Sequence, residues 1–137
     1  MRGIPARLRR LVIERARDRC EYCGLSQEGQ EAAFHVDHVI PRGVGGPTSA
    51  ENLALACVSC SLRKAARRTA VDPQTGEDTP LFHPRQDDWK QHFRWEGVRL
   101  VGLTASGRAT IAALEMNRLL ILAIRSEEAA LGRPPSR

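Results

Sequence analysis

The chain has 137 residues, a length that suits one domain and lets folding bury roughly 65 to 70% of the unfolded surface. Its longest apolar run, residues 119–124, is far shorter than the about 20 residues that a membrane span needs, so we expect no span. Lys and Arg number 21 against 16 Asp and Glu, and the net charge of +5 is compatible with a nucleic-acid partner.

An amphipathic helix is predicted from Pro5 to about Arg19. Proline is favoured at the first helical position, and apolar side chains then recur at the spacing of one helical face. These apolar residues are Leu8, Leu11, Val12 and Ala16. Residues 1–19 also carry seven arginines against only two acidic residues. Such a cluster could follow a phosphate backbone or simply form a solvated helix face.

Two CxxC pairs contain all the cysteines of the sequence: Cys20 with Cys23, and Cys57 with Cys60. Two close pairs are typical of a structural zinc site, in which four thiolates surround the metal at about 2.3 Å. The alternatives are two disulfides or four free thiols in the core. A disulfide framework belongs to small secreted chains, and no secretory signal precedes Cys20. We therefore expect a structural Zn²⁺ ion and a cytoplasmic protein.

The segment between the two pairs predicts two strands. Phe34 and Val36 alternate with His35 and Asp37, which is typical of a half-buried strand. Residues 41–49 are rich in Gly and Pro and should form a loop, and residues 53–55 alternate again as the returning strand. The second cysteine pair then leads into a helix expected over about residues 61–70.

Beyond residue 70 the sequence predicts a turn over residues 72–76 and a short helix that Asp87 caps. On this short helix Trp89 and Phe93 would lie four residues apart. A hairpin around Gly97 should follow.

A long helix is expected to begin after Thr104 or Ser106 and to reach about Leu131, where Gly and Pro residues stop it. Its apolar residues cover more than one face, which favours either deep packing or contact with a second copy. The sequence therefore leaves open a monomer or a homodimer formed through the C-terminal helix.

Residues from about 15 to 64 resemble the HNH endonuclease family. The resemblance is carried by RARDRCEYC, the strand HVDH, the loop glycines, the triplet of Glu51, Asn52 and Leu53, and CVSC followed by a helix with Lys64. It implies an α+β fold with a ββα-metal core and zinc knuckles. Residues 1–70 would form the nuclease core, and residues 71–137 would form a C-terminal extension packed on the same domain. Ser61 departs from the family, which usually has His or Asn at this position.

The resemblance also assigns the site. It implies His38 as the general base and Asn52 as the residue that holds the loop and orients His38. Asp37 would bind a catalytic Mg²⁺ or Mn²⁺ ion, with Ser61 at the third ligand position. His35 lies on the same face of the strand as Asp37, so it is either a further ligand or a strand residue bonded to solvent. Without the family, His38 beside Asp37 is ordinarily a structural pair and Asn52 a turn residue. Adjacent strand residues point in opposite directions, so Asp37 and His38 would share a site only if the strand distorts near its end, as the following Pro41 and glycines allow.

Basic residues after the first strand and on the following helix are expected to contact DNA phosphates, with solvated helix faces as the alternative. These residues are Arg42, Arg63, Lys64, Arg67 and Arg68. His83 and His92 lie outside the motif and are interpreted as packing or surface residues.

The resulting expectation is a metal-dependent DNA endonuclease that hydrolyses phosphodiester bonds by a one-metal mechanism. The alternative is a zinc-stabilised DNA-binding module with lost or weak cleavage, for which Ser61 would be the mark. A zinc domain that serves only protein contacts fits the basic clusters less well.

Overall fold

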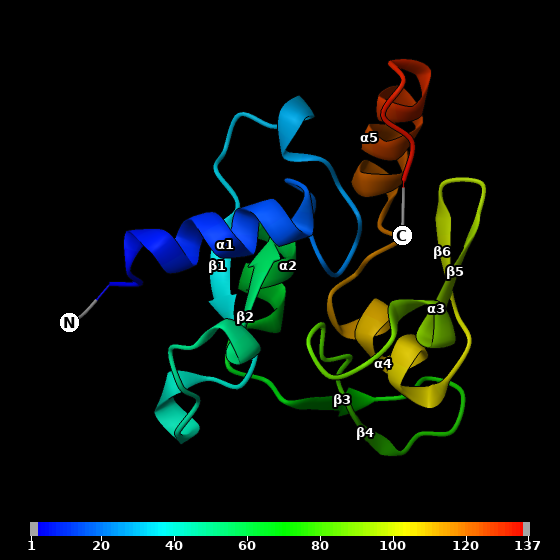
Figure 1. Ribbon diagram of the computed structural model, residues 1–137. Coiled ribbons are helices and arrows are strands. Elements are labelled where there is room, and N and C mark those ends of the chain that lie inside the picture. The colour runs from blue at the N-terminus through cyan, green and yellow to red at the C-terminus, as the bar shows by residue number, and fades with distance from the viewer. Residues whose placement is uncertain (1–2, 136–137) are drawn as a thin grey trace.

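The computed structural model describes residues 3–135 and has an α+β fold (Figure 1). Within this range the α-helices are α1 (Ala6–Ala16), α2 (Val58–Lys64), α3 (Trp89–His92), α4 (Ala105–Ala113) and α5 (Leu119–Ala130). The strands are β1 (His35–His38), β2 (Leu53–Ala56), β3 (Thr69–Val71), β4 (Asp78–Pro80), β5 (Phe93–Glu96) and β6 (Arg99–Gly102). No helix in residues 3–135 has the combined length and apolar character needed to cross a bilayer.

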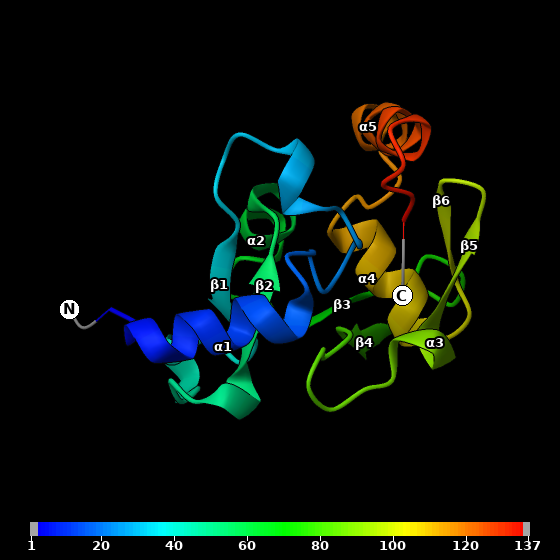
Figure 2. The ribbon, with the colours of Figure 1, turned by 45° about the horizontal axis from the view of Figure 1, so that its top comes forward.

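The elements form two neighbouring groups (Figures 1 and 2). The first group holds α1, the antiparallel pair β1–β2, and α2. The second holds the hairpins β3–β4 and β5–β6 with α3 and α4, while α5 stands at one corner. Buried side chains from both groups form one continuous cluster, from Val12 on α1 to Ile121 on α5, and the cysteines belong to it.

The β1–β2 pair sits at the centre of the first group. Val36 pairs with Leu55 and His38 with Leu53, and all four residues of β2 are buried. Helix α1 packs on this pair through Val12. It ends at Ala16, before the predicted Arg19, because Arg17 and Asp18 take left-handed backbone angles with φ of 53° and 57°.

Helix α2 lies earlier than the helix predicted over residues 61–70. The Cys57 side chain caps it by accepting the N–H of Cys60, so the helix begins inside the second cysteine pair. It ends at Lys64, because Ala65 has a φ of 49° that no right-handed helix contains. Residues 69–71 then pair with residues 78–80 as the hairpin β3–β4, and the predicted turn over residues 72–76 joins the two strands.

The predicted short helix and hairpin are both present. Helix α3 is a single turn whose cap is Asp88 rather than Asp87, and Asp87 instead accepts the N–H of His83. The rings of Trp89 and Phe93 lie with their centres 5.2 Å apart, as the spacing indicated. β5 and β6 pair around Gly97, whose φ is 61°.

The long C-terminal helix is broken, contrary to the prediction. Thr104 caps α4, which ends at Ala113, and α5 begins only at Leu119. In the break, Glu115 has a φ of 47°, and the Asn117 side chain bonds to both the N–H and the carbonyl of Leu100 at 2.8 and 2.7 Å. These bonds fix the break to β6. The apolar residues that were predicted to share one helix are therefore divided between α4 and α5. Leu119 and Leu120 remain 85% and 64% exposed.

Candidate active site and metal centre

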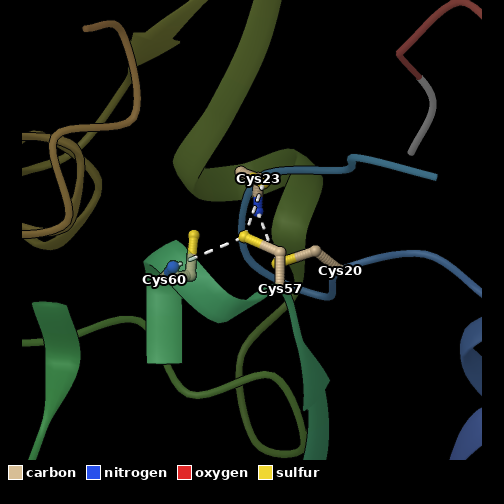
Figure 3. A group of neighbouring side chains, drawn as sticks. All are labelled: Cys20, Cys23, Cys57 and Cys60. Atoms are coloured by element: carbon tan, nitrogen blue, oxygen red, sulfur yellow. Dashed lines mark hydrogen bonds between the residues drawn. The ribbon is translucent and has the colours of Figure 1, made fainter. Parts of the chain in front are cut away.

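The four cysteines come together from two segments far apart in the sequence (Figure 3). Their sulfur atoms all lie within 4.8 Å of one another, and all four side chains are buried. The Sγ atoms of Cys23 and Cys57 are 3.7 Å apart, too far for a disulfide and close to the about 3.8 Å edge of a tetrahedron with 2.3 Å arms. The cluster therefore suggests a closed, structural zinc site.

The local backbone favours this use of the sulfurs. The N–H groups of Cys23 and Cys60 point at the sulfurs of Cys20 and Cys57, at 3.5 and 3.4 Å, as expected for two zinc knuckles. Hydrogen bonds with the other three thiols and burial raise the pKa of the Cys60 thiol well above its usual range. Four thiolates in one buried place need a cation, and Zn²⁺ with four Cys ligands meets that need.

Glu21 fastens the first knuckle to β2. Its N–H donates to the carbonyl of Leu55 at 2.8 Å, and its carboxylate accepts the N–H of Leu55 at 2.9 Å. The same carboxylate pairs with Arg85, and the indole N–H of Trp89 donates to the carbonyl of Tyr22 at 3.2 Å. The knuckle is thus tied to both groups of elements.

A polar pocket of about 740 Å³ lies along β1, and its lining includes residues 33–38 without interruption. Consecutive strand residues face opposite sides, so such a lining means that the pocket follows the free edge of β1. Asp37 and His38 therefore share the pocket. The distortion that the sequence led us to expect is absent, because β1 stays in regular antiparallel register with β2 through His38.

His38 is the neutral imidazole in this pocket. Its Nε2 lies 2.8 Å from the hydroxyl of Thr48, in the loop between the strands. Burial and then the positive charge of Arg42 lower the pKa of His38 below the usual 6.5, and the nearby Asp37 carboxylate only partly opposes them. At pH 7 the ring is uncharged and able to accept a proton.

Asp37 is paired with Lys64. The Nζ atom lies 3.0 Å from Oδ2 of Asp37 and donates to the carbonyl of His38 at 3.1 Å. Burial raises the pKa of Asp37, and Lys64 works against that rise. The Lys64 side chain is 2% exposed, which corrects the expectation that it contacts DNA phosphates: it faces Asp37 instead.

Asn52 organises the loop between the strands. Its Oδ1 accepts the N–H of Ile40 at 2.9 Å, and its Nδ2 donates to the carbonyls of Ile40 and Pro47 at 3.0 and 2.9 Å. These bonds tie the loop backbone at Ile40 and Pro47 to Asn52. The amide reaches the backbone of Ile40, two residues past His38, so any effect on the His38 ring passes through the backbone.

His35 and Ser61 meet across the β1–α2 contact. Nδ1 of His35 lies 2.9 Å from the Ser61 hydroxyl, and both residues line the pocket with Asp37. The three side chains put an imidazole, a hydroxyl and a carboxylate in one cavity. In residues 3–135, the cysteine cluster is the only group of three or more Cys, His, Asp or Glu side chains close enough to hold a metal by themselves.

The remaining basic residues are divided. Arg42 lines the pocket, and so does Arg9 of α1, which the sequence had placed only in a general basic cluster. Arg67 and Arg68 line a separate cavity of about 230 Å³ beside Lys64 and His83. Arg63 forms an ion pair with Glu115. The periodicity of α1 could have indicated which face of the helix carries Arg9, but no sequence signal shows that Arg9 and His38 line the same pocket.

The two histidines outside the motif have packing roles. Nδ1 of His83 accepts the N–H of Arg85 at 3.1 Å, and Nδ1 of His92 lies 2.6 Å from the hydroxyl of Thr104. The ring of His92 also packs edge-on against Phe82. These contacts agree with the interpretation of both histidines as packing residues.

Residues 20–67 match the model of the HNH endonuclease family. This confirms the resemblance seen in the sequence, and the matched segment contains the four cysteines, β1, β2 and α2. The match indicates nuclease or DNA-binding function, since HNH proteins are generally nucleases that act on DNA. Comparison with curated proteins and with solved structures gave no match.

Proposed function

We propose that the protein is a metal-dependent DNA endonuclease that hydrolyses phosphodiester bonds by a one-metal HNH mechanism. The observation that carries the proposal is the β1-edge pocket, in which His38 and Asp37 lie together inside the HNH segment. The order β1, β2, α2, braced by the cysteine cluster, supports a ββα-metal core. In this proposal residues 1–70 are the nuclease core and residues 71–137 an extension packed on it.

His38 would act as the general base. Its lowered pKa keeps the ring neutral at pH 7, so it can take a proton from an attacking water, a contribution of about 10² to 10⁴ in rate. A water that takes the place of the Thr48 hydroxyl at Nε2 would lie where this transfer can occur. Asn52 would keep the loop, and therefore the backbone beside His38, in place.

Asp37 would hold the catalytic Mg²⁺ or Mn²⁺ ion, with Ser61 and His35 as further donors. Mg²⁺ is commonly held by one or two carboxylates plus phosphate oxygens and water, so a single carboxylate in an open pocket fits this ion. When bound, the ion neutralises charge on the phosphate and polarises it. Lys64 competes for the same carboxylate, and its positive charge would weaken metal binding at Asp37.

The phosphate backbone would be contacted by arginines around the pocket. Arg42 and Arg9 line the pocket itself, and Arg63, Arg67 and Arg68 lie on and after α2. Their contacts would be independent of sequence and weakened by salt. The unpaired state of the four cysteines also fits a reducing compartment such as the cytoplasm.

The decisive experiment incubates supercoiled plasmid with the purified protein and Mg²⁺ or Mn²⁺. Magnesium is withheld in the control rather than chelated, so that zinc stays in place. His38→Ala should bind DNA normally and cut at least about a hundredfold more slowly. His92→Asn is the matched control, because it removes an imidazole bonded to Thr104 in the other group of elements. Equal loss of binding and cleavage in His38→Ala would assign His38 a structural role.

A zinc-stabilised DNA-binding module with little or no cleavage is the second candidate. Two observations favour it: Lys64 occupies the Asp37 carboxylate, and Ser61 offers a hydroxyl where the family usually has His or Asn. A module of this kind would shift the plasmid in a gel without nicking it at any Mg²⁺ or Mn²⁺ concentration. Recovery of cleavage in Ser61→Asn or Ser61→His would then locate the defect at the metal.

A further inference from the structure

Helix α5 buries an arginine beside the cysteine cluster. Arg125 is 2% exposed, and it is one of the largest fully enclosed side chains in the described part of the chain. Its Nη1 donates to the carbonyl of Val98 at 3.0 Å and to Oδ1 of Asn117 at 3.3 Å. Its guanidinium carbon lies 5.0 Å from the centre of the Trp95 ring. Every one of these partners is uncharged.

A buried cation without a counter-charge is costly. Among residues 3–135, no carboxylate lies within 4.0 Å of the Arg125 guanidinium, and its buried Nε and Nη2 atoms lack a well-aligned hydrogen bond. Charges that are removed from water are normally paired or bound to a metal site. Arg133, in the same C-terminal segment, does have such a partner, since it pairs with Glu128. The charge of Arg125 therefore needs another explanation.

Helix α5 lies against the cysteine site. Arg125 lines one small cavity with Gly24 and Leu25, the two residues that directly follow Cys23, and Ile121 and Ile124 of the same helix line another cavity with Cys57. Burial lowers the pKa of Arg125, and the neighbouring Cys23 leads the groups that act in the opposite direction, followed by Cys60 and Cys20. A Zn²⁺ ion with four thiolates has two negative charges in excess, buried in the same core. Outer groups that neutralise or hydrogen-bond to metal ligands adjust the affinity of such sites by about 10- to 100-fold.

We propose that Arg125 is the outer-shell cation of the zinc–cysteine centre, and that it fastens helix α5 to that centre. The thiolates lower the cost of burying the guanidinium, and the guanidinium lowers the cost of burying excess negative charge. Binding of the metal and docking of α5 then reinforce each other by the same free energy. The proposal rests on the zinc that the cysteine cluster suggests, and it is independent of DNA cleavage.

The test compares zinc release from the folded, zinc-loaded protein to a chromogenic chelator. Arg125→Met removes the charge and keeps much of the volume, and it should release zinc about 10 to 100 times faster. Arg125→Lys keeps the charge, and its rate of zinc release should lie between those of the wild type and Arg125→Met. Arg133→Met is the matched control, since it removes an arginine from the same C-terminal segment that pairs with Glu128 instead. It should release zinc at the wild-type rate.

A second readout separates charge from packing. In the Co²⁺-substituted protein, loss of a neighbouring cation raises the energy of the thiolate lone pairs, so the sulfur-to-cobalt band of Arg125→Met should move to longer wavelength. A role in packing alone would leave that band in place. If Arg125→Met fails to fold, Arg125→Gln removes the charge and retains a donor for Val98, and it serves for both measurements.

The outcomes are distinct. Unchanged zinc release and an unshifted cobalt band in a folded, charge-removing variant would overturn the role of Arg125. Well under one zinc per chain in fresh wild-type protein would instead overturn the zinc assignment on which the inference rests. Failure of plasmid cleavage would bear on neither.

Discussion

Lys64 controls the state of Asp37 in the pocket. The pair is buried on the lysine side, and removal of one partner of a buried pair leaves the other charge without compensation. We expect Lys64→Met to lower the free energy of unfolding by about 3 kcal/mol. Urea denaturation with and without Mg²⁺ in the buffer measures this change. Mg²⁺ should restore part of the loss, because it can replace the missing positive charge at Asp37.

The exposed Arg67 provides the control for Lys64. Arg67→Met removes a positive charge from the same region and should change stability by less than about 0.5 kcal/mol, with no added response to Mg²⁺. An identical stability of Lys64→Met and wild type would show that the ion pair with Asp37 contributes nothing in solution.

Arg42 contributes, after burial, to the lowered pKa of His38. Burial and the Arg42 charge lower the pKa of His38, so the ring loses its proton at a lower pH than an ordinary histidine. Arg42→Gln removes one of these causes and should raise the pKa. The acid side of the cleavage-rate profile, where activity increases as His38 becomes neutral, should therefore move to higher pH. An NMR titration of the His38 ring gives the same shift without DNA, and a shift to lower pH would contradict the prediction.

The sequence identified His38 and Asp37, but it could not separate the basic residues by role. The spacing of Lys64 and Arg67 on one stretch of chain suggested similar phosphate contacts. The fold turns Lys64 inward to Asp37 because α2 packs on β1, while the chain leaves the helix at Ala65 and exposes Arg67. Whether Lys64 or Arg67 is buried depends on where α2 ends, and no local sequence pattern marked that end.

At the scale of elements, Asp72 joins the β3–β4 turn to α4. Its carboxylate accepts two bonds from Arg108, at 3.0 and 2.8 Å, and others from the N–H of Gln74 and the hydroxyl of Thr75. The bonds from Arg108 lead in lowering the pKa of Asp72 to about 2. A depressed pKa contributes stability that is complete above the unfolded value of about 3.8 and is lost as the pH falls through about 2.

Asp72→Asn should therefore destabilise the protein equally at pH 7 and pH 4.5. The difference from wild type should begin to shrink below about pH 3.8, where the carboxylate of the unfolded chain takes up a proton, and should vanish once the pH has fallen through about 2. Urea denaturation of both proteins across this range makes the comparison, with Asp78→Asn, an exposed acid in the same hairpin, as the control. A difference that disappears already at pH 4.5 would exclude the Arg108 pair as its source.

Helices and strands were predictable from the sequence where neighbouring residues along the chain determine them. Gly97 and the alternation around it predicted the β5–β6 hairpin, and Trp89 with Phe93 predicted their contact. The prediction of one long C-terminal helix was wrong, because the break in it depends on Asn117, which bonds to Leu100 in a different element. A favourable local helix pattern was overridden by a tertiary contact.

At the scale of the whole molecule, the cysteine cluster brings together two segments that are far apart in the sequence, with Cys57 lying 34 residues after Cys23 along the chain. A structural zinc contributes an apparent binding free energy of about 10 to 16 kcal/mol, comparable with the stability of an entire domain. Cys57→Ser should unfold the protein or lower its melting temperature by well over 10 °C. Metal analysis should find about one zinc per wild-type chain, and a folded, fully stable zinc-free chain would contradict this role.

The α+β class and the clustering of the cysteines followed from the sequence, because two CxxC pairs and the HNH pattern are strong local signals. The contact between the two groups of elements did not follow. It depends on the hydrogen bond from Trp89 to Tyr22 and on the burial of Arg125 in the core. Trp89 and Arg125 are both far from the cysteines along the chain.

The bonds between Glu21 and Leu55 also bear on how the protein behaves at high concentration. A two-stranded sheet has two open edges, and an open edge is a template on which another chain can add a strand. Glu21 occupies the edge of β2 with both its backbone and its carboxylate. The edge of β1 is lined by the polar pocket, with Asp37 and the two histidines beside it. One edge is therefore closed and the other is charged, which protects the small central sheet from aggregation by strand pairing.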